Sequence, residues 1–285
     1  MEPTNKTSFL KIHIKPIWGF SIIFVLLLIV AQWAHVINLK AAQAEKAFTE
    51  SLEIQKKLVA YASWQREVTR TFQSLPLLAD HVEIVNSSRG NVLFEKEAGR
   101  SQALASVTKL MTALLVTENI SADEKITISP EALLPEGDNG LIEGETWSRD
   151  DLLAFMLIVS SNDAAQAFAE TISNKRGVPF TQLMNDKAKE LGLSSLIFKT
   201  PSGLDVEKTP GIIDPVNAMP GGYGNAQDVS QLAEYILKMS PLIAQNSVIK
   251  QKVFTATKNG ATQTHIANNT NEALPLIPNP LLSKT

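Results

Sequence analysis

Residues 105–113 decide how the rest of this chain is interpreted, and they read Ala105-Ser106-Val107-Thr108-Lys109-Leu110-Met111-Thr112-Ala113. Ser106 and Lys109 stand three residues apart, at the start of an apolar run that predicts a helix. Positions i and i+3 share one face of a helix, so the two side chains are expected to touch. The stretch therefore places a hydroxyl beside an amine.

This pairing has a possible chemical use. A serine hydroxyl is a weak nucleophile until a neighbouring base removes its proton, and a desolvated lysine can be that base. The apolar residues that follow Lys109 are expected to bury its amine and lower its pKa. Taken alone, Ser106 and Lys109 are more often a helix start with an exposed lysine, so the interpretation depends on the rest of the chain.

Composition narrows the classes of function. A chain of 285 residues with 44% hydrophobic residues can bury a full core in one or two domains. A net charge of -3, without a basic cluster that includes aromatics, gives no sign of nucleic-acid binding. The chain has no cysteine, and its four histidines lack metal-ligand spacing, so we expect neither a disulfide framework nor a zinc site. Chemistry without a metal or cofactor is the expectation.

The N-terminal region predicts a membrane anchor. Residues 1–16 carry several lysines and are expected to form a cytoplasmic tail, while residues 17–39 form an uncharged apolar run of the length that spans a bilayer. The lysines before this run predict a cytoplasmic N-terminus and a domain on the extracytoplasmic side. A cleaved signal peptide is the alternative, because residues 41–44 are small enough for a signal peptidase. Both interpretations export the rest of the chain.

Two further regions follow the anchor. Residues 40–76 are rich in helix formers and predict a helical stalk, whose apolar positions are too irregular for a clear coiled-coil seam. Pro76 ends this region, and a folded domain is expected over residues 77–285. Residues 81–97 predict a β-hairpin with a turn at 86–91. The helix at 106–118 is expected to lie against the sheet as a central core element.

The middle of the domain predicts a second polar cluster. Residues 123–129 are strand-like, residues 135–140 predict a loop, and Ser148 is expected to cap a buried helix at 149–159. Residues 160–165 then read Ser160-Ser161-Asn162-Asp163-Ala164-Ala165. Hydroxyls and an amide between two buried helices need hydrogen-bonding partners, which a catalytic cleft provides. The simpler interpretation makes Ser160 and Asn162 helix caps, and Asp163 is expected to be an N-cap or a structural partner.

The last third of the chain predicts further elements. We expect helices at 181–193 and 228–239, a loop at 200–205, a loosely packed segment at 210–224, and strands at 253–257 and 264–267. Ser202 and Asp205 are interpreted as residues that shape the loop.

These segments together resemble the D-alanyl-D-alanine carboxypeptidases, which are the low-molecular-weight penicillin-binding proteins. The resemblance covers residues 80–285 and is carried by residues 105–113, 160–164, 201–205 and 283–285 in that order. It implies an α+β domain of the β-lactamase/transpeptidase type, with an antiparallel sheet flanked by helices and a helical subdomain. The apolar run at residues 17–39 is expected to precede this domain as one transmembrane helix.

The resemblance also implies a role for each matching residue. Ser106 would be the acylated nucleophile, and its backbone N–H would contribute to the oxyanion hole; Lys109 would be its base. Ser160 would relay a proton towards the leaving D-alanine, and Asn162 would hold the acyl chain and Lys109.

The segment Ser283-Lys284-Thr285 matches the start of the family's third motif, which implies the substrate-binding residues. Lys284 would attract the substrate's terminal carboxylate, and Thr285 would donate a hydroxyl to it. In the family this motif continues with a glycine on an edge strand, whereas this sequence ends at Thr285. We therefore expect the sequence to be a fragment, cut within the third motif, and the chain as written to be poorly active or inactive.

Three functions are compared on this basis. The first is a membrane-anchored serine carboxypeptidase that removes D-alanine from peptidoglycan stem peptides and binds β-lactams covalently. The second is a serine β-lactamase, which is disfavoured because Glu170, Glu190 and Glu207 lack the sequence setting of a deacylating glutamate. The third is a non-catalytic cell-wall scaffold of the same fold.

Overall fold

The structure is a computed structural model that describes residues 16–87, 90–137, 140–206 and 219–285. The chain divides into two compact units, Met1–Thr71 and Phe72–Thr285.

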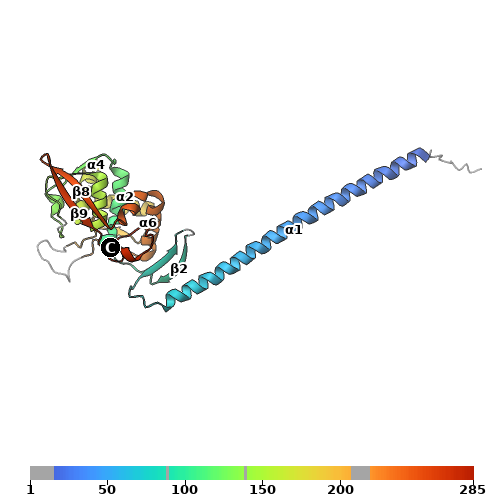
Figure 1. Ribbon diagram of the computed structural model, residues 1–285, viewed down its shortest axis with the longest axis horizontal. Coiled ribbons are helices and arrows are strands. Elements are labelled where there is room, and N and C mark those ends of the chain that lie inside the picture. Colours follow the sequence, from blue (N-terminus) through green and yellow to red (C-terminus); the bar gives the residue numbers. More distant parts are fainter. Residues whose placement is uncertain (1–15, 88–89, 138–139, 207–218) are drawn as a thin grey trace, which may run out of the picture. The chain divides into compact units, whose positions relative to one another are not determined.

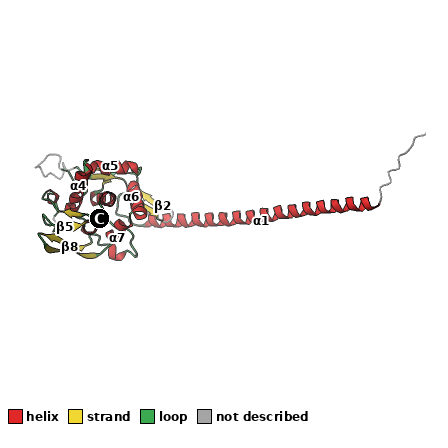
Figure 2. Cartoon of the chain, turned by 90° about the horizontal axis from the view of Figure 1, so that it is seen from above, coloured by secondary structure: helices red, strands yellow, loops and turns green. Residues whose placement is uncertain are grey.

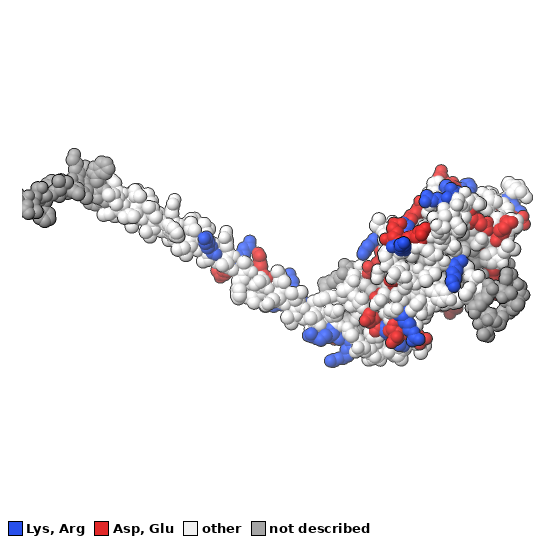
Figure 3. All heavy atoms as spheres, turned by 180° about the vertical axis from the view of Figure 1, so that it is seen from behind, with Lys and Arg blue, Asp and Glu red and all other residues white. Residues whose placement is uncertain are grey.

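A single long helix, α1 (Pro16–Ser74), accounts for the described part of the first unit (Figure 1). After Pro16 the helix contains no proline, and its 59 residues would extend about 90 Å at the rise of an α-helix. Its described part from Ser21 onwards contains an 18-residue window with a mean hydropathy of 2.3, and none of that window is buried. On the face drawn in Figure 3, charged side chains occur only along the second part of α1. The helix is thus long and apolar enough to cross a membrane.

The predicted hairpin is present at the start of the second unit. Strands β1 (Val82–Asn86) and β2 (Asn91–Lys96) pair antiparallel as a separate two-stranded sheet. Gly90 closes the turn with a φ of +69°, and its N–H donates to the Asn86 carbonyl at 2.7 Å. Residues 88 and 89 of the predicted turn lie outside the described residues.

Two further antiparallel sheets complete the strands of the described chain. The first has the order β3-β7-β6, and the second has the order β4-β5-β8-β9. Their strands are β3 (Gln102–Ala103), β4 (Lys125–Thr127), β5 (Thr146–Ser148), β6 (Ile197–Phe198), β7 (Gly222–Gly224), β8 (Gln251–Lys258) and β9 (Ala261–Asn268). The strands predicted within 123–129, 253–257 and 264–267 are therefore confirmed. Strand β7 lies within the segment 210–224, for which loose packing and no strand was expected. Residues 210–218 of that segment lie outside the described residues.

Helices contain more residues of the second unit than strands do (Figure 2). They are η1 (Ala105–Thr108), α2 (Lys109–Asn119), η2 (Glu131–Leu133), α3 (Arg149–Val159), α4 (Asn162–Arg176), α5 (Phe180–Glu190), α6 (Ala226–Met239), α7 (Pro241–Ser247) and η3 (Leu274–Leu276). The expected cap of α3 is confirmed, because the Ser148 hydroxyl accepts a hydrogen bond from the Asp151 N–H at 3.2 Å. The fold is α+β, as the sequence predicts.

The position of α2 differs from the expectation. All of its residues from Lys109 to Val116 are buried, as expected of a core helix. It packs, however, against helices α3 to α7 rather than against a sheet. The reason is that its buried residues surround the whole helix, and a helix that is apolar on every side needs neighbours on every side.

An aromatic cluster joins β5, α3, β8 and β9. Trp147 is fully buried, and its ring centroid lies 5.2 Å from that of Phe155 and 4.9 Å from that of His265. Phe254 completes the cluster. The buried carboxylate of Glu145 pairs with His265 at 2.9 Å and accepts a hydrogen bond from the Trp147 indole at 3.2 Å. A buried carboxylate with these hydrogen-bond partners is satisfied. Because the rings of the cluster come from both the four-stranded sheet and α3, the cluster holds the sheet against this helix.

Candidate active site

Ser106 lies in the 3-10 turn that leads into α2, where its side chain is half-buried. Ala105 before it has a φ of +45°, so the chain bends sharply as it enters the turn. The Lys109 amine reaches back along the same face to the Ser106 hydroxyl, at 3.0 Å. The predicted contact between the two side chains is therefore present.

Lys109 is fully buried and its amine contacts a set of uncharged groups. Besides Ser106, it donates to the Asn162 side-chain oxygen at 2.8 Å and to the Ser202 carbonyl at 3.0 Å. Burial, followed by the positive charge of Lys284, lowers the pKa of Lys109 from 10.5 to about 7. A neutral amine has two N–H donors and one lone pair. If the donors serve Asn162 and Ser202, the lone pair is directed at the Ser106 hydroxyl, which is the arrangement that a general base requires.

Asn162 is the first residue of α4, and its amide is held at both ends. Its oxygen accepts from Lys109, while its nitrogen donates to the Glu136 carbonyl at 2.7 Å. The N-cap of α4 is Ser161, whose hydroxyl accepts from the Ala164 N–H at 3.1 Å. Ser161, rather than Asn162 or Asp163, is therefore the N-cap of α4, while Ser160 caps the C-terminus of α3 and Asp163 is buried.

Ser160 occupies the short junction between α3 and α4. It ends α3 in the left-handed region, with a φ of +59°, and its hydroxyl accepts from the Lys284 amine at 2.7 Å. Burial lowers the pKa of Lys284 from 10.5 to about 8. Thr285, the last residue, has its hydroxyl 2.7 Å from that of Thr270. The structure thus brings Lys284 to Ser160, and it places Lys284 and Thr285 outside any strand of the described chain.

The loop at 200–205 contributes a group that sequence reasoning missed. Ser202 is buried, and its backbone carbonyl, rather than its hydroxyl, is the acceptor for Lys109. The neighbouring Pro201 carbonyl accepts from the Thr112 hydroxyl at 2.5 Å, which ties the loop to α2. A carbonyl is present at every residue, so the residue type carries no signal for this contact; Gly203 is the one local indication of a close approach.

Gly203 is required at this point of the loop. Its φ is +82°, and a Cβ atom there would lie 1.8 Å from the Ala105 carbonyl oxygen and 2.7 Å from the Thr108 hydroxyl. Such distances cannot be relieved without moving the loop away from η1. Glycine therefore permits the Ser202 carbonyl to reach Lys109.

We expect Gly203→Ala to destabilise the domain and to reduce acylation of Ser106, because the loop must move away from η1. Gly192→Ala is the matched control, since Gly192 also has a positive φ, of +74°, but no atom within 4 Å of its Cβ position. The control should cost about 1 kcal/mol for the left-handed backbone alone. Urea unfolding and penicillin labelling measure both effects; equal losses in the two variants would contradict the steric argument.

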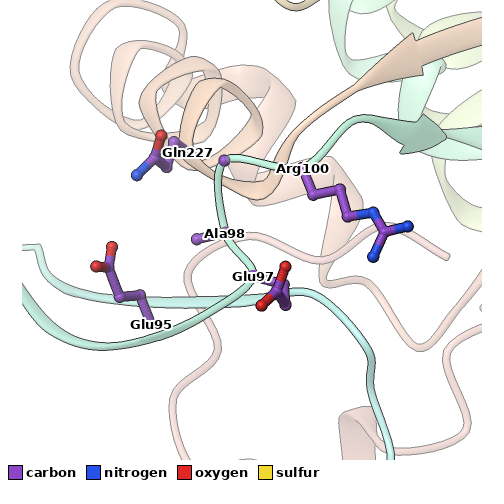
Figure 4. Close-up of a pocket in the computed structure, with 6 residues that line it drawn as sticks. Glu95, Glu97, Ala98, Arg100 and Gln227 are labelled. Carbon is purple, nitrogen blue, oxygen red and sulfur yellow. The ribbon is translucent and has the colours of Figure 1, made fainter.

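A cavity of about 510 Å³ lies elsewhere in the second unit, between the end of β2 and the first turn of α6. Its lining residues are Glu95, Glu97, Ala98, Gly99, Arg100 and Gln227. Figure 4 shows Glu95 and Arg100 pointing away from each other. The cavity shares no residue with the Ser106 site. The described part of the chain holds no group of histidine and carboxylate side chains arranged for a metal ion.

Comparisons with known proteins give the family and the fold of the chain. The model of the D-alanyl-D-alanine carboxypeptidase family, peptidase family S11, matches residues 68–278. The D-alanyl-D-alanine carboxypeptidase DacF of Bacillus subtilis is 35% identical over 161 residues, which is 54% of this chain and 38% of that protein. The chain spans about two fifths of the length of the curated relatives it matches.

Solved structures show the same fold. The C98A mutant of Streptomyces K15 DD-transpeptidase superposes with a TM-score of 0.65 at 24% identity, covering 74% of this chain and 82% of that one. Penicillin-binding protein D2 from Listeria monocytogenes, in its cefotaxime-bound form, gives a TM-score of 0.57 at 29% identity, covering 72% and 77%. Because the family model matches more than half of the sequence, this chain belongs to the D-alanyl-D-alanine carboxypeptidase family.

Proposed function

We propose that this protein is a serine-type D-alanyl-D-alanine carboxypeptidase, which removes the terminal D-alanine from peptidoglycan stem peptides and is acylated by β-lactams. The observation that carries the proposal is the buried Lys109 amine, 3.0 Å from the Ser106 hydroxyl and with a pKa lowered to about 7. A lysine of this kind is neutral in much of the population near neutral pH. It can therefore accept the proton that makes Ser106 a nucleophile.

Each step of the proposed acylation uses a group in the site. Lys109 removes the proton from Ser106, whose oxygen attacks the carbonyl carbon of the penultimate D-alanine. The backbone N–H of Ser106 stabilises the oxyanion. The C–N bond to the terminal D-alanine breaks, and the leaving amine receives, through Ser160, the proton that Lys109 took from Ser106. Water then hydrolyses the ester to release the shortened peptide and regenerate Ser106.

Substrate binding is assigned to the third motif. Lys284 is the cation that attracts the terminal carboxylate, and Thr285 contributes a hydroxyl to it. The Lys284 amine lies 2.7 Å from Ser160, so a carboxylate bound by Lys284 would be held close to the proton relay. Asn162 fixes Lys109 and contacts the acyl chain.

The location follows from the N-terminal segment. We propose that residues 17–39 anchor the protein in the cell membrane, with residues 1–16 in the cytoplasm and residues 40–76 as a stalk. Residues 77–285 then form the catalytic domain on the extracytoplasmic side, where peptidoglycan is found. The apolar window of α1 supports the anchor, and the lysines before it support the orientation.

A β-lactamase is the second candidate, and the contacts of its possible deacylating glutamates disfavour it. The Glu170 carboxylate accepts hydrogen bonds from Ser129 at 2.5 Å and from Gln166 at 3.0 Å. Glu190 forms an ion pair with Lys187 at 3.0 Å. Both carboxylates are thus engaged by groups outside the Ser106 site, and Glu207 lies outside the described residues.

The test compares two substrates with protein purified from the membranes of the cells that make it. We expect release of D-alanine from a peptide that ends in Lys-D-Ala-D-Ala. We also expect a penicillin adduct whose lifetime is many times longer than one turnover of the peptide. Rapid hydrolysis of penicillin without release of D-alanine would instead identify a β-lactamase. A protein that does neither would be the non-catalytic scaffold.

A further inference from the structure

The segment that carries Lys284 is held in place by a hydrogen-bonded network beside the site. Ser283 is buried, and its backbone N–H donates to the Ser247 hydroxyl of α7 at 3.0 Å. Its hydroxyl accepts from the Asn271 side-chain nitrogen at 2.7 Å. The residue before Lys284 is therefore fixed through both its backbone and its side chain.

Asn271 is itself fixed by the turn that follows β9. Its backbone N–H donates to the Asn269 side-chain oxygen at 2.9 Å, and its side-chain oxygen accepts from the Ala273 N–H at 3.0 Å. The Asn269 side-chain nitrogen donates to the carbonyls of Ser247 and Ile249, both at 2.9 Å. The turn and the end of α7 thus form one rigid support. Its only connection to the Ser283 side chain among the described contacts is the Asn271 amide.

We propose that Asn271, acting through Ser283, is a positioning residue that holds the Lys284 amine against Ser160. This inference rests on the proposed function, because it assigns a purpose to the position of Lys284. An ammonium group prefers water, and the lowered pKa of Lys284 shows that burial disfavours its charged form. The bond of Lys284 to Ser160 and that of Thr285 to Thr270 act at and beyond Lys284, and the hydrogen bonds of Ser283 fix the backbone that leads into it.

The position of Lys284 also affects the catalytic base. Its positive charge is the second cause, after burial, of the lowered pKa of Lys109. The other groups that contact the Lys109 amine, from η1, α4 and the 200–205 loop, are uncharged: Ser106, Asn162 and the Ser202 carbonyl. If Lys284 moves out into solvent, the pKa of Lys109 must rise, and less of the neutral base is present at pH 7.

The test is the titration of the two lysine amines by NMR in the full chain in detergent micelles, using ¹³C-labelled lysine. We expect Asn271→Ala to raise the pKa values of both Lys109 and Lys284, and Ser283→Ala to do the same. A rise of about one unit for Lys109 would lower the neutral fraction, and with it the rate of penicillin acylation at pH 7, about fivefold. The double variant should show no further rise, because both changes break the same hydrogen bond.

Two controls separate positioning from general destabilisation. Asn119→Ala removes a similar half-buried amide bond, to the Leu115 carbonyl at 2.8 Å, about 15 Å along α2 from Lys109, and should leave both titrations unchanged. In a Lys284→Met background, Asn271→Ala should no longer move the pKa of Lys109. A shift of equal size in that background would overturn the inference.

The inference and the proposed function fail in different ways. If Asn271→Ala leaves both lysine titrations as in the parent, Asn271 does not position Lys284, whatever the enzyme does. If protein purified from the membranes of its source cells is not acylated by penicillin and releases no D-alanine, the proposed function fails, while the titrations of the 285-residue chain still decide whether Asn271 holds Lys284.

Discussion

Replacing Ser106 with alanine is expected to abolish the covalent penicillin adduct and to lower D-alanine release by about 10⁴-fold or more. The reason is that the hydroxyl oxygen itself forms the bond to the acyl group. The Ser106 side chain is half-buried and makes one described hydrogen bond, with Lys109, so the variant should remain folded.

The measurement is the mass of the intact protein after incubation with penicillin, together with fluorescent-penicillin labelling of source-cell membranes. Ser101→Ala is the matched control, because Ser101 is an exposed serine that precedes η1. It should be labelled as the parent is. An adduct of equal yield in Ser106→Ala would show that another residue is the nucleophile and would overturn the proposed mechanism.

Replacing Lys109 with methionine is expected to lower the rate of acylation by about 10²–10⁴-fold, the range that loss of a general base produces. Methionine is apolar and of similar length, so it can occupy a site that is fully buried. The Ser106 hydroxyl remains but keeps its proton. The adduct should therefore form slowly, and stopped-flow or quenched-flow labelling measures its rate.

The pH dependence provides a second readout of the same base. In the parent, acylation should increase as the pH rises through about 7, because Lys109 must lose its proton before it can accept one from Ser106. This acidic limb should disappear in Lys109→Met. Lys125→Met, which changes an exposed lysine of β4, is the control and should retain the parental profile. A parental profile in Lys109→Met would mean that another group is the base.

Much of the site could be predicted where the signal is local. Ser106 and Lys109 are three residues apart in one helical segment, so their contact follows from helix geometry. The cap at Ser148 and the strands that became β8 and β9 were predicted for the same reason, because capping residues and alternating patterns act over a few positions. The boundaries of anchor, stalk and domain remain predictions.

Other contacts could not be predicted, because they join distant parts of the chain through groups that carry no sequence signal. Lys109 bonds to the Ser202 backbone, 93 residues away. Its bond to Asn162, 53 residues away, was expected from the family resemblance alone, not from the spacing of the residues. The sequence likewise gives no signal that the backbone carbonyl of Glu136 accepts a hydrogen bond from Asn162 and orients it. The expected packing of α2 against a sheet was wrong because periodicity shows that a helix is buried but does not show what covers it.

The sequence by itself determined the order of chemical groups: an apolar N-terminal run, a serine and a lysine on one helical face, a polar junction at Ser160 to Asn162, and a lysine near the end. Only the tertiary structure decided which of these groups meet, and how strongly each amine is desolvated. A pKa depends on burial and on charges that folding brings within a few ångströms, and neither is a property of the residue alone. The basicity of Lys109, on which the proposed chemistry depends, is therefore set by the fold.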